Sequence, residues 1–184
     1  MNLTTADRRA HYDDFVAHVR DLCTTPRIRA DLAKCRGRRV EQISGEARRC
    51  LIKQIHPYGA QRAHYTVAAL IALERPAHRI PQPEPAGDSA PAWHQRPNLG
   101  ATLADAASRR PASARPMDRR LRLMVRLSSD LLHPRLPGLA NLLLQTGCHP
   151  DWAVLLEDLA LWDINTRQVI SRWQDSFYLA LPGD

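Results

Sequence analysis

Apolar side chains recur every three or four residues along most of this chain, and that spacing places them on one face of an α-helix. Near the start, Tyr12, Phe15, Val19 and Leu22 follow this spacing, which predicts a first helix from about residue 6 to residue 23. The alternating pattern of a half-buried β-strand is nearly absent. The sequence therefore predicts an all-α fold, and its 184 residues are enough to bury a core without disulfide or metal staples.

Capping residues divide the first part of the chain into further helices. Thr25 and Ser44 are suited to begin the second and third helices, because their hydroxyls can accept a hydrogen bond from a backbone N–H of the first turn. Gly37 is expected to end the second helix. A fourth helix is expected over residues 60–75, so residues 1–75 are predicted to form an N-terminal helical bundle.

A proline-rich segment separates this bundle from the rest of the chain. Residues 76–97 combine several prolines with Gly and Ser, which cannot hold helical hydrogen bonds and indicate an extended or disordered linker. Asn98 is expected to cap the helix that follows it. Residues 98–184 are predicted to form a C-terminal helical bundle. Its later helices are expected over residues 117–128, in a Leu-rich segment ending at residue 147, and over 150–162 and 166–181.

Positive charge is concentrated in two parts of the chain. The formal net charge is +7 and the isoelectric point is near 9.8. Basic residues outnumber acidic ones strongly over residues 27–62 and again over residues 109–135, whereas the chain after residue 136 is acidic. A local basic excess of this kind indicates a polyanionic partner, and nucleic acid is the leading candidate.

The second basic region carries an arginine stripe. On a helix that begins near residue 117, Arg119, Arg122 and Arg126 fall within about 60° of one another. An ordinary solvated face is the alternative, but such faces mix both signs, and here only Asp118 accompanies the arginines. Stacked like charges favour a bound phosphate backbone. The same argument applies less strongly to basic residues of the first region: Lys34, Arg36, Arg38, Arg39, Arg49, Lys53 and Arg62.

Motifs for catalysis are not visible in the sequence. The eight histidines have no zinc-type spacing, and there is neither a P-loop nor a GxSxG motif. The adjacent carboxylates Asp13 with Asp14, and Glu157 with Asp158, are expected on solvated helix faces rather than in an acid–base pair. We therefore expect a protein without enzymatic activity, without a cofactor and without a bound metal.

Cysteine and tryptophan positions indicate core packing rather than chemistry. The four cysteines form no CxxC pair and are expected to be reduced. Trp152, Trp162 and Trp173 have helical spacing among leucines and are expected in the core, whereas Trp93 in the linker is freer to anchor on a partner or fold back. No run approaches the roughly 20 apolar residues of a membrane span, and the N-terminus lacks a signal-peptide pattern, so a cytoplasmic location is expected.

Motifs spread over nearly the whole chain resemble one known family. Their order is His56-Pro57-Tyr58-Gly59, Asn98-Leu99-Gly100, Arg119-Arg120, Asp151-Trp152, Leu155-Leu156, Asp158-Leu159, Leu161-Trp162-Asp163, Val169, Arg172-Trp173 and Phe177-Tyr178. With these motifs the chain resembles the small, CasB-type subunit of type I-E CRISPR Cascade surveillance complexes.

The resemblance implies a non-catalytic subunit made of two small helical bundles and acting in antiviral defence. Implied partners are guide crRNA, the target and displaced DNA strands, a second copy in a head-to-tail dimer, and the other Cascade subunits, namely the CasA large subunit, the CasC backbone, CasD and CasE. Such a subunit would stabilise the R-loop. Backbone-binding positions implied by the resemblance are Lys34, Arg36, Arg62, Arg119 and Arg120.

Arg135 is a further candidate, although Pro134 and Pro137 interrupt a helix that usually bears arginines in these subunits. Together, the predicted nucleic-acid-binding residues are Lys34, Arg36, Arg49, Arg62, Arg119, Arg120, Arg122, Arg126 and Arg135.

Two other functions remain open at this point. A free-standing helix-turn-helix regulator would need a recognition helix that reads base edges, usually in a two-fold dimer. A metal-dependent nuclease would need acidic ligands beside the basic face.

Overall fold

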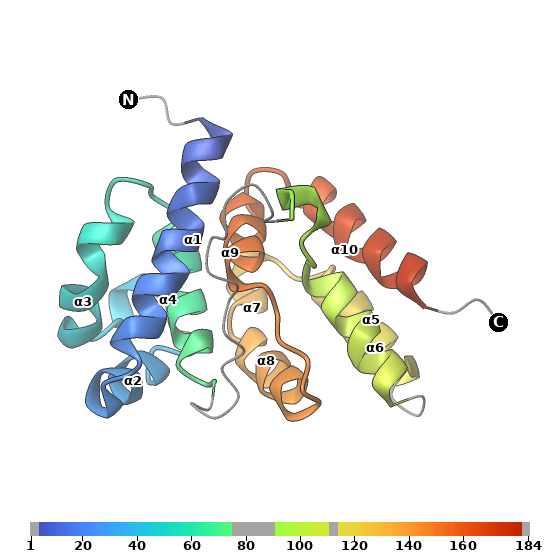
Figure 1. Cartoon of the computed structure of the whole chain (residues 1–184), viewed down its shortest axis with the longest axis horizontal. Helices are drawn as coiled ribbons and strands as arrows, with labels where there is room; N and C mark the ends of the chain where they lie inside the picture. Colours follow the sequence, from blue (N-terminus) through green and yellow to red (C-terminus); the bar gives the residue numbers. More distant parts are fainter. Residues whose placement is uncertain (1–3, 75–90, 111–113, 182–184) are drawn as a thin grey trace.

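A computed structural model of the chain describes residues 4–74, 91–110 and 114–181, and within these ranges it contains helices and no β-strand (Figure 1). The all-α prediction is confirmed. The α-helices are α1 (Thr5–Leu22), α2 (Pro26–Ala33), α3 (Gly45–Ile55), α4 (Gln61–Ile71), α5 (Leu99–Arg109), α6 (Ala114–Met124), α7 (Ser129–Leu132), α8 (Leu136–Gln145), α9 (Trp152–Leu161) and α10 (Thr166–Ala180). Short 3₁₀ helices are η1 (Val40–Gln42) and η4 (Trp93–Gln95).

Side-chain caps begin several of these helices. The Ser44 and Asn98 side chains accept hydrogen bonds from the backbone N–H groups of Ala47 and Ala101, as the sequence predicts. Thr25 occupies the N-cap position of α2, but its hydroxyl makes no capping hydrogen bond. The start of α2 therefore depends on Pro26, whose fixed φ suits the first turn of a helix.

The boundaries of α6 differ from the sequence prediction. The helix begins at Ala114 rather than near residue 117, because Pro116 lies in its first turn, where a backbone N–H has no helical partner to lose. It ends at Met124 rather than near residue 128. Arg126 therefore lies in the turn that follows, where its N–H bonds the carbonyl of Leu123 at 3.2 Å.

The helix α4 also ends early, at Ile71 instead of residue 75, while the later helices lie close to their expected positions.

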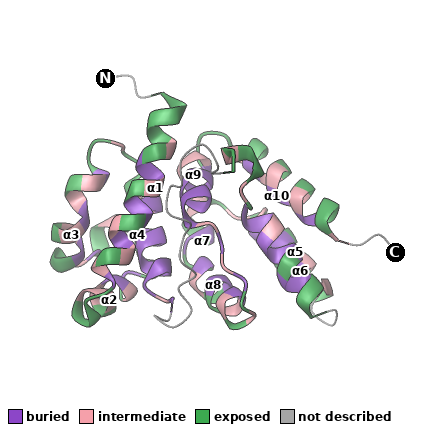
Figure 2. Cartoon of the chain, in the orientation of Figure 1, coloured by how far each residue is buried: buried purple, intermediate pink, exposed green. Residues whose placement is uncertain are grey.

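Among the described helices, α4 and α9 have the largest share of buried residues. In Figure 1, α1–α4 lie on one side, α5, α6 and α10 on the other, and α7–α9 between them. Helix α9 packs against α1 and α4, and α5 packs against α6 and α10. Residues 63–71 of α4 and 152–159 of α9 are all buried, as the colouring of Figure 2 shows. Buried residues from both halves of the chain form one connected apolar core.

The packing of α5 on α10 requires a glycine. A Cβ at position 100 would lie 1.9 Å from the carbonyl oxygen of Trp173, so a larger residue would force the two helices apart. Trp152, Trp162 and Trp173 are all core residues, which confirms the sequence prediction. All four cysteines are free thiols.

Candidate nucleic-acid interface

Helix α6 presents arginines on the side opposite its buried residues. Met117, Leu121 and Met124 face the core. The exposed side of the helix and the turn that follows it carry what we call the α6 surface: Arg115, Arg119, Arg120, Arg122 and Arg126. A shallow hollow of about 520 Å³ lies over part of this surface and is lined by Arg115, Pro116, Arg119, Arg120 and Leu123. One side of α6 is therefore cationic and exposed, and its opposite side is apolar and packs into the core.

The acidic residue of α6 serves only one of these arginines. The Arg122 guanidinium lies 2.9 Å from a carboxylate oxygen of Asp118, which also accepts a hydrogen bond from the Tyr178 hydroxyl at 2.6 Å. The hydrogen bond that Arg122 itself donates to Asp118 raises the pKa of the Arg122 guanidinium. Arg119 and Arg126 form no ion pair with a carboxylate of the described residues. They are therefore better placed than Arg122 to receive phosphate oxygens.

A second basic surface forms from segments that are distant in the sequence. The turn at Gly37 lies against Pro134, since a Cβ at position 37 would stand 2.9 Å from the Pro134 Cα. This contact joins the loop after α2 to the turn between α7 and α8. The exposed or half-buried arginines around the junction form what we call the loop surface: Arg36, Arg38, Arg39, Arg62 and Arg135.

One carboxylate lies within the loop surface. Asp130 accepts a hydrogen bond from Arg62 at 2.5 Å and lies 3.7 Å from the Arg39 guanidinium. The hydrogen bond from Arg62, followed by the charge of Arg39, lowers the pKa of Asp130. Asp130 is exposed, so an incoming phosphate can reach the same two guanidinium groups that it holds.

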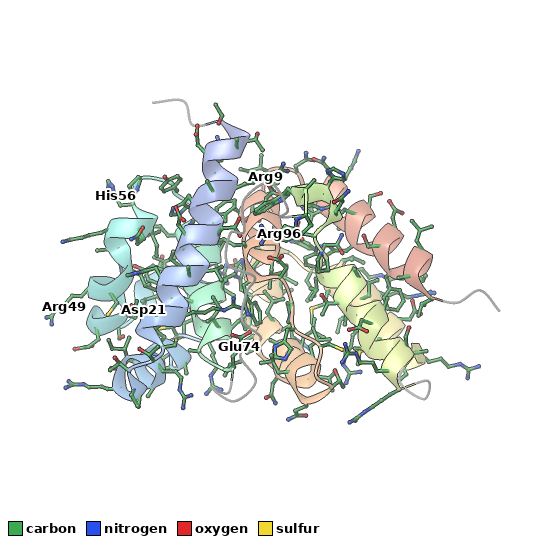
Figure 3. The ribbon with its side chains drawn as sticks, viewed as in Figure 1. Arg9, Asp21, Arg49, His56, Glu74 and Arg96 are labelled. Atoms are coloured by element: carbon green, nitrogen blue, oxygen red, sulfur yellow. The ribbon has the colours of Figure 1, made fainter. Side chains whose placement is uncertain are left out.

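Two of the predicted residues lie apart from these contacts. Lys34 pairs with Asp31 on the preceding turn of α2 at 2.8 Å. Arg49, on α3, lines a separate groove of about 220 Å³ between α2 and α3 together with Arg27. Figure 3 shows Arg49 at the outer edge of α3. The structure therefore gathers most of the predicted residues into two surfaces, but it brings neither Lys34 nor Arg49 into them.

Buried carboxylates on α9 overturn one sequence prediction. Glu157 and Asp158, expected on a solvated face, are both buried. Asp158 accepts a hydrogen bond from the Trp173 indole at 2.6 Å and pairs with Arg172, while Glu157 accepts one from Arg9 at 2.8 Å. The two carboxylates are buried because neighbouring helices enclose α9. A buried charge needs a charged or hydrogen-bonding partner, which explains the contacts with Arg172, Trp173 and Arg9. Apart from Glu157 and Asp158, residues 152–162 place apolar side chains on every face of the helix, and this sequence pattern indicates a helix enclosed by others.

Trp93 and Arg96 join the two halves of the molecule, and Trp93 folds back onto its own chain, which is one of the two alternatives that the sequence leaves open for it. Its indole donates to Glu157 at 2.7 Å, and its ring lies under the guanidinium groups of both Arg9 and Arg96. Arg96 hydrogen-bonds both carboxylate oxygens of Asp13 and both of Asp151 at 2.7–2.9 Å. In Figure 3, Arg9 and Arg96 are labelled close to each other, near α9.

The charge of Arg96 is fixed by these contacts. Burial alone would lower the pKa of the Arg96 guanidinium, but the hydrogen bonds to Asp13 and Asp151 raise it above its ordinary value. Arg96 is therefore a structural cation and is unavailable to nucleic acid.

Three histidines are buried in neutral form. His64 Nδ1 donates to the Ala60 carbonyl, which leaves its Nε2 to accept from His11 Nε2 at 3.1 Å. His11 also stacks on Tyr58. His133, beneath the loop surface, hydrogen-bonds the Thr66 hydroxyl at 2.7 Å. Burial is the main cause that lowers the pKa of each of these histidines to about 4.

Among the described residues, no three His, Cys, Asp or Glu side chains converge as metal ligands would. The helices described here include none that is both long and apolar enough to cross a membrane.

Comparison with known proteins identifies the family. The sequence profile of CRISPR-associated protein Cse2 matches residues 28–178, and the chain belongs to this family. The resemblance that the sequence motifs indicated is thereby confirmed. The chain is also similar to a solved chain of a CRISPR RNA-guided surveillance complex, with 30% identity, a TM-score of 0.80 and 95% of each chain covered. A second similar chain, from such a complex in a pre-nicking state, has 31% identity, a TM-score of 0.81 and 94% of each chain covered. A comparison with curated proteins finds no match.

Proposed function

We propose that this chain is the non-catalytic small subunit of a type I-E Cascade complex and that it stabilises the R-loop by binding guide RNA and unwound DNA. The observation that carries the proposal is the α6 surface. Its exposed arginines lie over a buried apolar face, and two of them, Arg119 and Arg126, pair with no carboxylate of the described residues. Membership of the Cse2 family and similarity to chains of surveillance complexes support the same role.

The physical role of such a surface follows from the energetics of strand exchange. Replacing a DNA duplex by an RNA–DNA heteroduplex is nearly balanced in free energy, so modest contacts to a strand can decide the direction. Guanidinium groups that contact phosphates hold a strand without reading its sequence. The α6 surface and the loop surface would provide these contacts for guide and unwound strands of any sequence.

The proposed partners are those of a complex subunit in the cytoplasm. They are guide crRNA, the target and displaced DNA strands, the CasA, CasC, CasD and CasE subunits, and a second copy of the chain arranged head to tail. A division into two bundles at residues 76–97 stays part of the proposal, since residues 75–90 lie outside the described ranges. Family membership favours this role over a free-standing helix-turn-helix regulator.

The test replaces arginines in a reconstituted complex. Arg119→Ala combined with Arg126→Ala should shorten the lifetime of the R-loop about ten-fold or more. It should also reduce the slope of the logarithm of the R-loop formation constant against the logarithm of salt concentration, by roughly one unit for each lost phosphate contact. The matched control removes two exposed arginines elsewhere, with Arg8→Ala on α1 and Arg167→Ala on α10. If both double variants behave like the unchanged complex, the α6 surface has no such role.

A further inference from the structure

A polar groove lies beside the α6 surface, between the end of α6 and α10. Its volume is about 280 Å³, and it is lined by Arg122, Val125, Arg126, Gln174 and Tyr178. Gln174 and Tyr178 lie four residues apart and so share one face of α10, across from the two arginines. The groove thus combines guanidinium, carboxamide and phenol groups at the edge of the basic face.

Tyr178 is an exposed aromatic ring whose orientation is fixed. Its hydroxyl donates to Asp118 at 2.6 Å, and its ring meets that of Phe177 edge to face at a centroid distance of 5.2 Å. The residue nevertheless remains 45% exposed. A ring held by its hydroxyl and left open to solvent loses little conformational freedom when a flat ligand stacks on it.

The neighbouring groups fit the rest of a nucleotide. Arg126 forms no ion pair with a carboxylate among the described residues and can bind a phosphate. The Gln174 carboxamide has both a donor and an acceptor for a base edge. Aromatic stacking tolerates any base but requires that base to be unpaired, because paired bases already stack within a duplex.

We propose that this groove holds one unpaired nucleotide, with its base stacked on Tyr178 and its phosphate at Arg126. The inference rests on the proposed function and extends it. With this groove, the protein recognises an unpaired base of a single strand in addition to the phosphate backbone. Tyr178 and Gln174 belong to the acidic C-terminal part of the chain, where no nucleic-acid-binding residue is expected from charge.

The experiment compares two labelled single strands of equal length, one with natural bases and one fully abasic, that carry the same phosphates. Their binding to the purified full-length chain is measured by fluorescence anisotropy at fixed salt. The natural strand should bind about five-fold or more tightly than the abasic strand, since stacking of a base on an aromatic side chain supplies a difference of that size. Tyr178→Leu should abolish this difference, and Tyr178→Phe should retain it.

Two controls separate this site from the phosphate contacts. Leu179→Ala removes an exposed apolar side chain next to Tyr178, outside the groove, and should leave the preference intact. Arg119→Ala should weaken the binding of both strands by the same factor. Equal binding of the two strands by the unchanged chain overturns the nucleotide site and leaves the phosphate-binding proposal standing. Absence of binding to either strand overturns both.

Discussion

Gly37 lies directly against Pro134, with its backbone in the left-handed region at φ +66°. A residue with a side chain would meet two obstacles there, the strained backbone conformation and the Pro134 Cα 2.9 Å from its Cβ. This contact holds the loop after α2 against the turn between α7 and α8. It is therefore one of the contacts that bring the segments of the loop surface together, beside the ion pairs of Asp130 with Arg39 and Arg62.

Gly37→Ala should lower the free energy of unfolding by about 1–2 kcal/mol, because an L-residue in the left-handed region costs about that much before any clash is counted. Urea unfolding followed by circular dichroism measures the change. Gly45→Ala is the control, since a Cβ there meets no atom within 4 Å and Gly45 is exposed at the start of α3. Equal stability of both variants would contradict the importance of the Gly37–Pro134 contact.

Arg96→Ala should destabilise the fold by about 3 kcal/mol, because it leaves the carboxylates of Asp13 and Asp151 without their shared partner. Arg96→Lys keeps the charge but cannot reproduce the forked geometry, so it should recover only part of the loss. Unfolding in urea is again the measurement. Asp105→Asn, which breaks an exposed pair with Arg109, should change stability by less than about 1 kcal/mol.

Stability should fall between pH 6.5 and pH 5 because of the buried histidines. In the unfolded chain a histidine binds a proton near pH 6.5, whereas the folded-state pKa of His11, His64 and His133 is about 4. The unfolded state therefore binds more protons in this window. Each histidine lowers the free energy of unfolding by up to about 1.4 kcal/mol per pH unit as the pH falls.

Urea unfolding at several pH values tests this dependence. His133→Asn keeps a polar partner for the Thr66 hydroxyl but cannot titrate, so its slope between pH 6.5 and pH 5 should be shallower. The carboxyl groups of Asp7, Asp105 and Asp130 have lowered pKa values and bind protons only below this pH range. They therefore do not contribute to the slope between pH 6.5 and pH 5. A slope equal to that of the unchanged chain would argue against a neutral buried His133.

Asp130→Asn should strengthen the binding of single-stranded nucleic acid by about two- to five-fold at low salt. The substitution removes the carboxylate that holds Arg39 and Arg62, and it makes the loop surface one charge more positive. Anisotropy titrations with a labelled oligonucleotide at several salt concentrations measure the effect. Weaker binding would mean instead that Asp130 orients the two arginines for the phosphate.

The sequence predicted the helices and much of the candidate site, and the errors have identifiable causes. Ser44 and Asn98 begin helices as their capping chemistry requires. The sequence predicts the start of α6 near residue 117, after Pro116, because proline disrupts the interior of a helix, but Pro116 is tolerated in the first turn of α6. Its end was placed too late because the apolar spacing continues into the turn that contains Arg126.

The sequence by itself determined the fold class, the family resemblance and the arginine face of α6, because spacing along one helix fixes which side chains share a face. Only the tertiary structure decided which charged side chains are buried and which carboxylates pair with which arginines. It buried Glu157 and Asp158 beside arginines, and it gathered the loop surface around Asp130 from segments separated by about 70 residues. The physical reason is that burial and charge pairing depend on which helices lie next to one another, and helical periodicity carries no information about those neighbours.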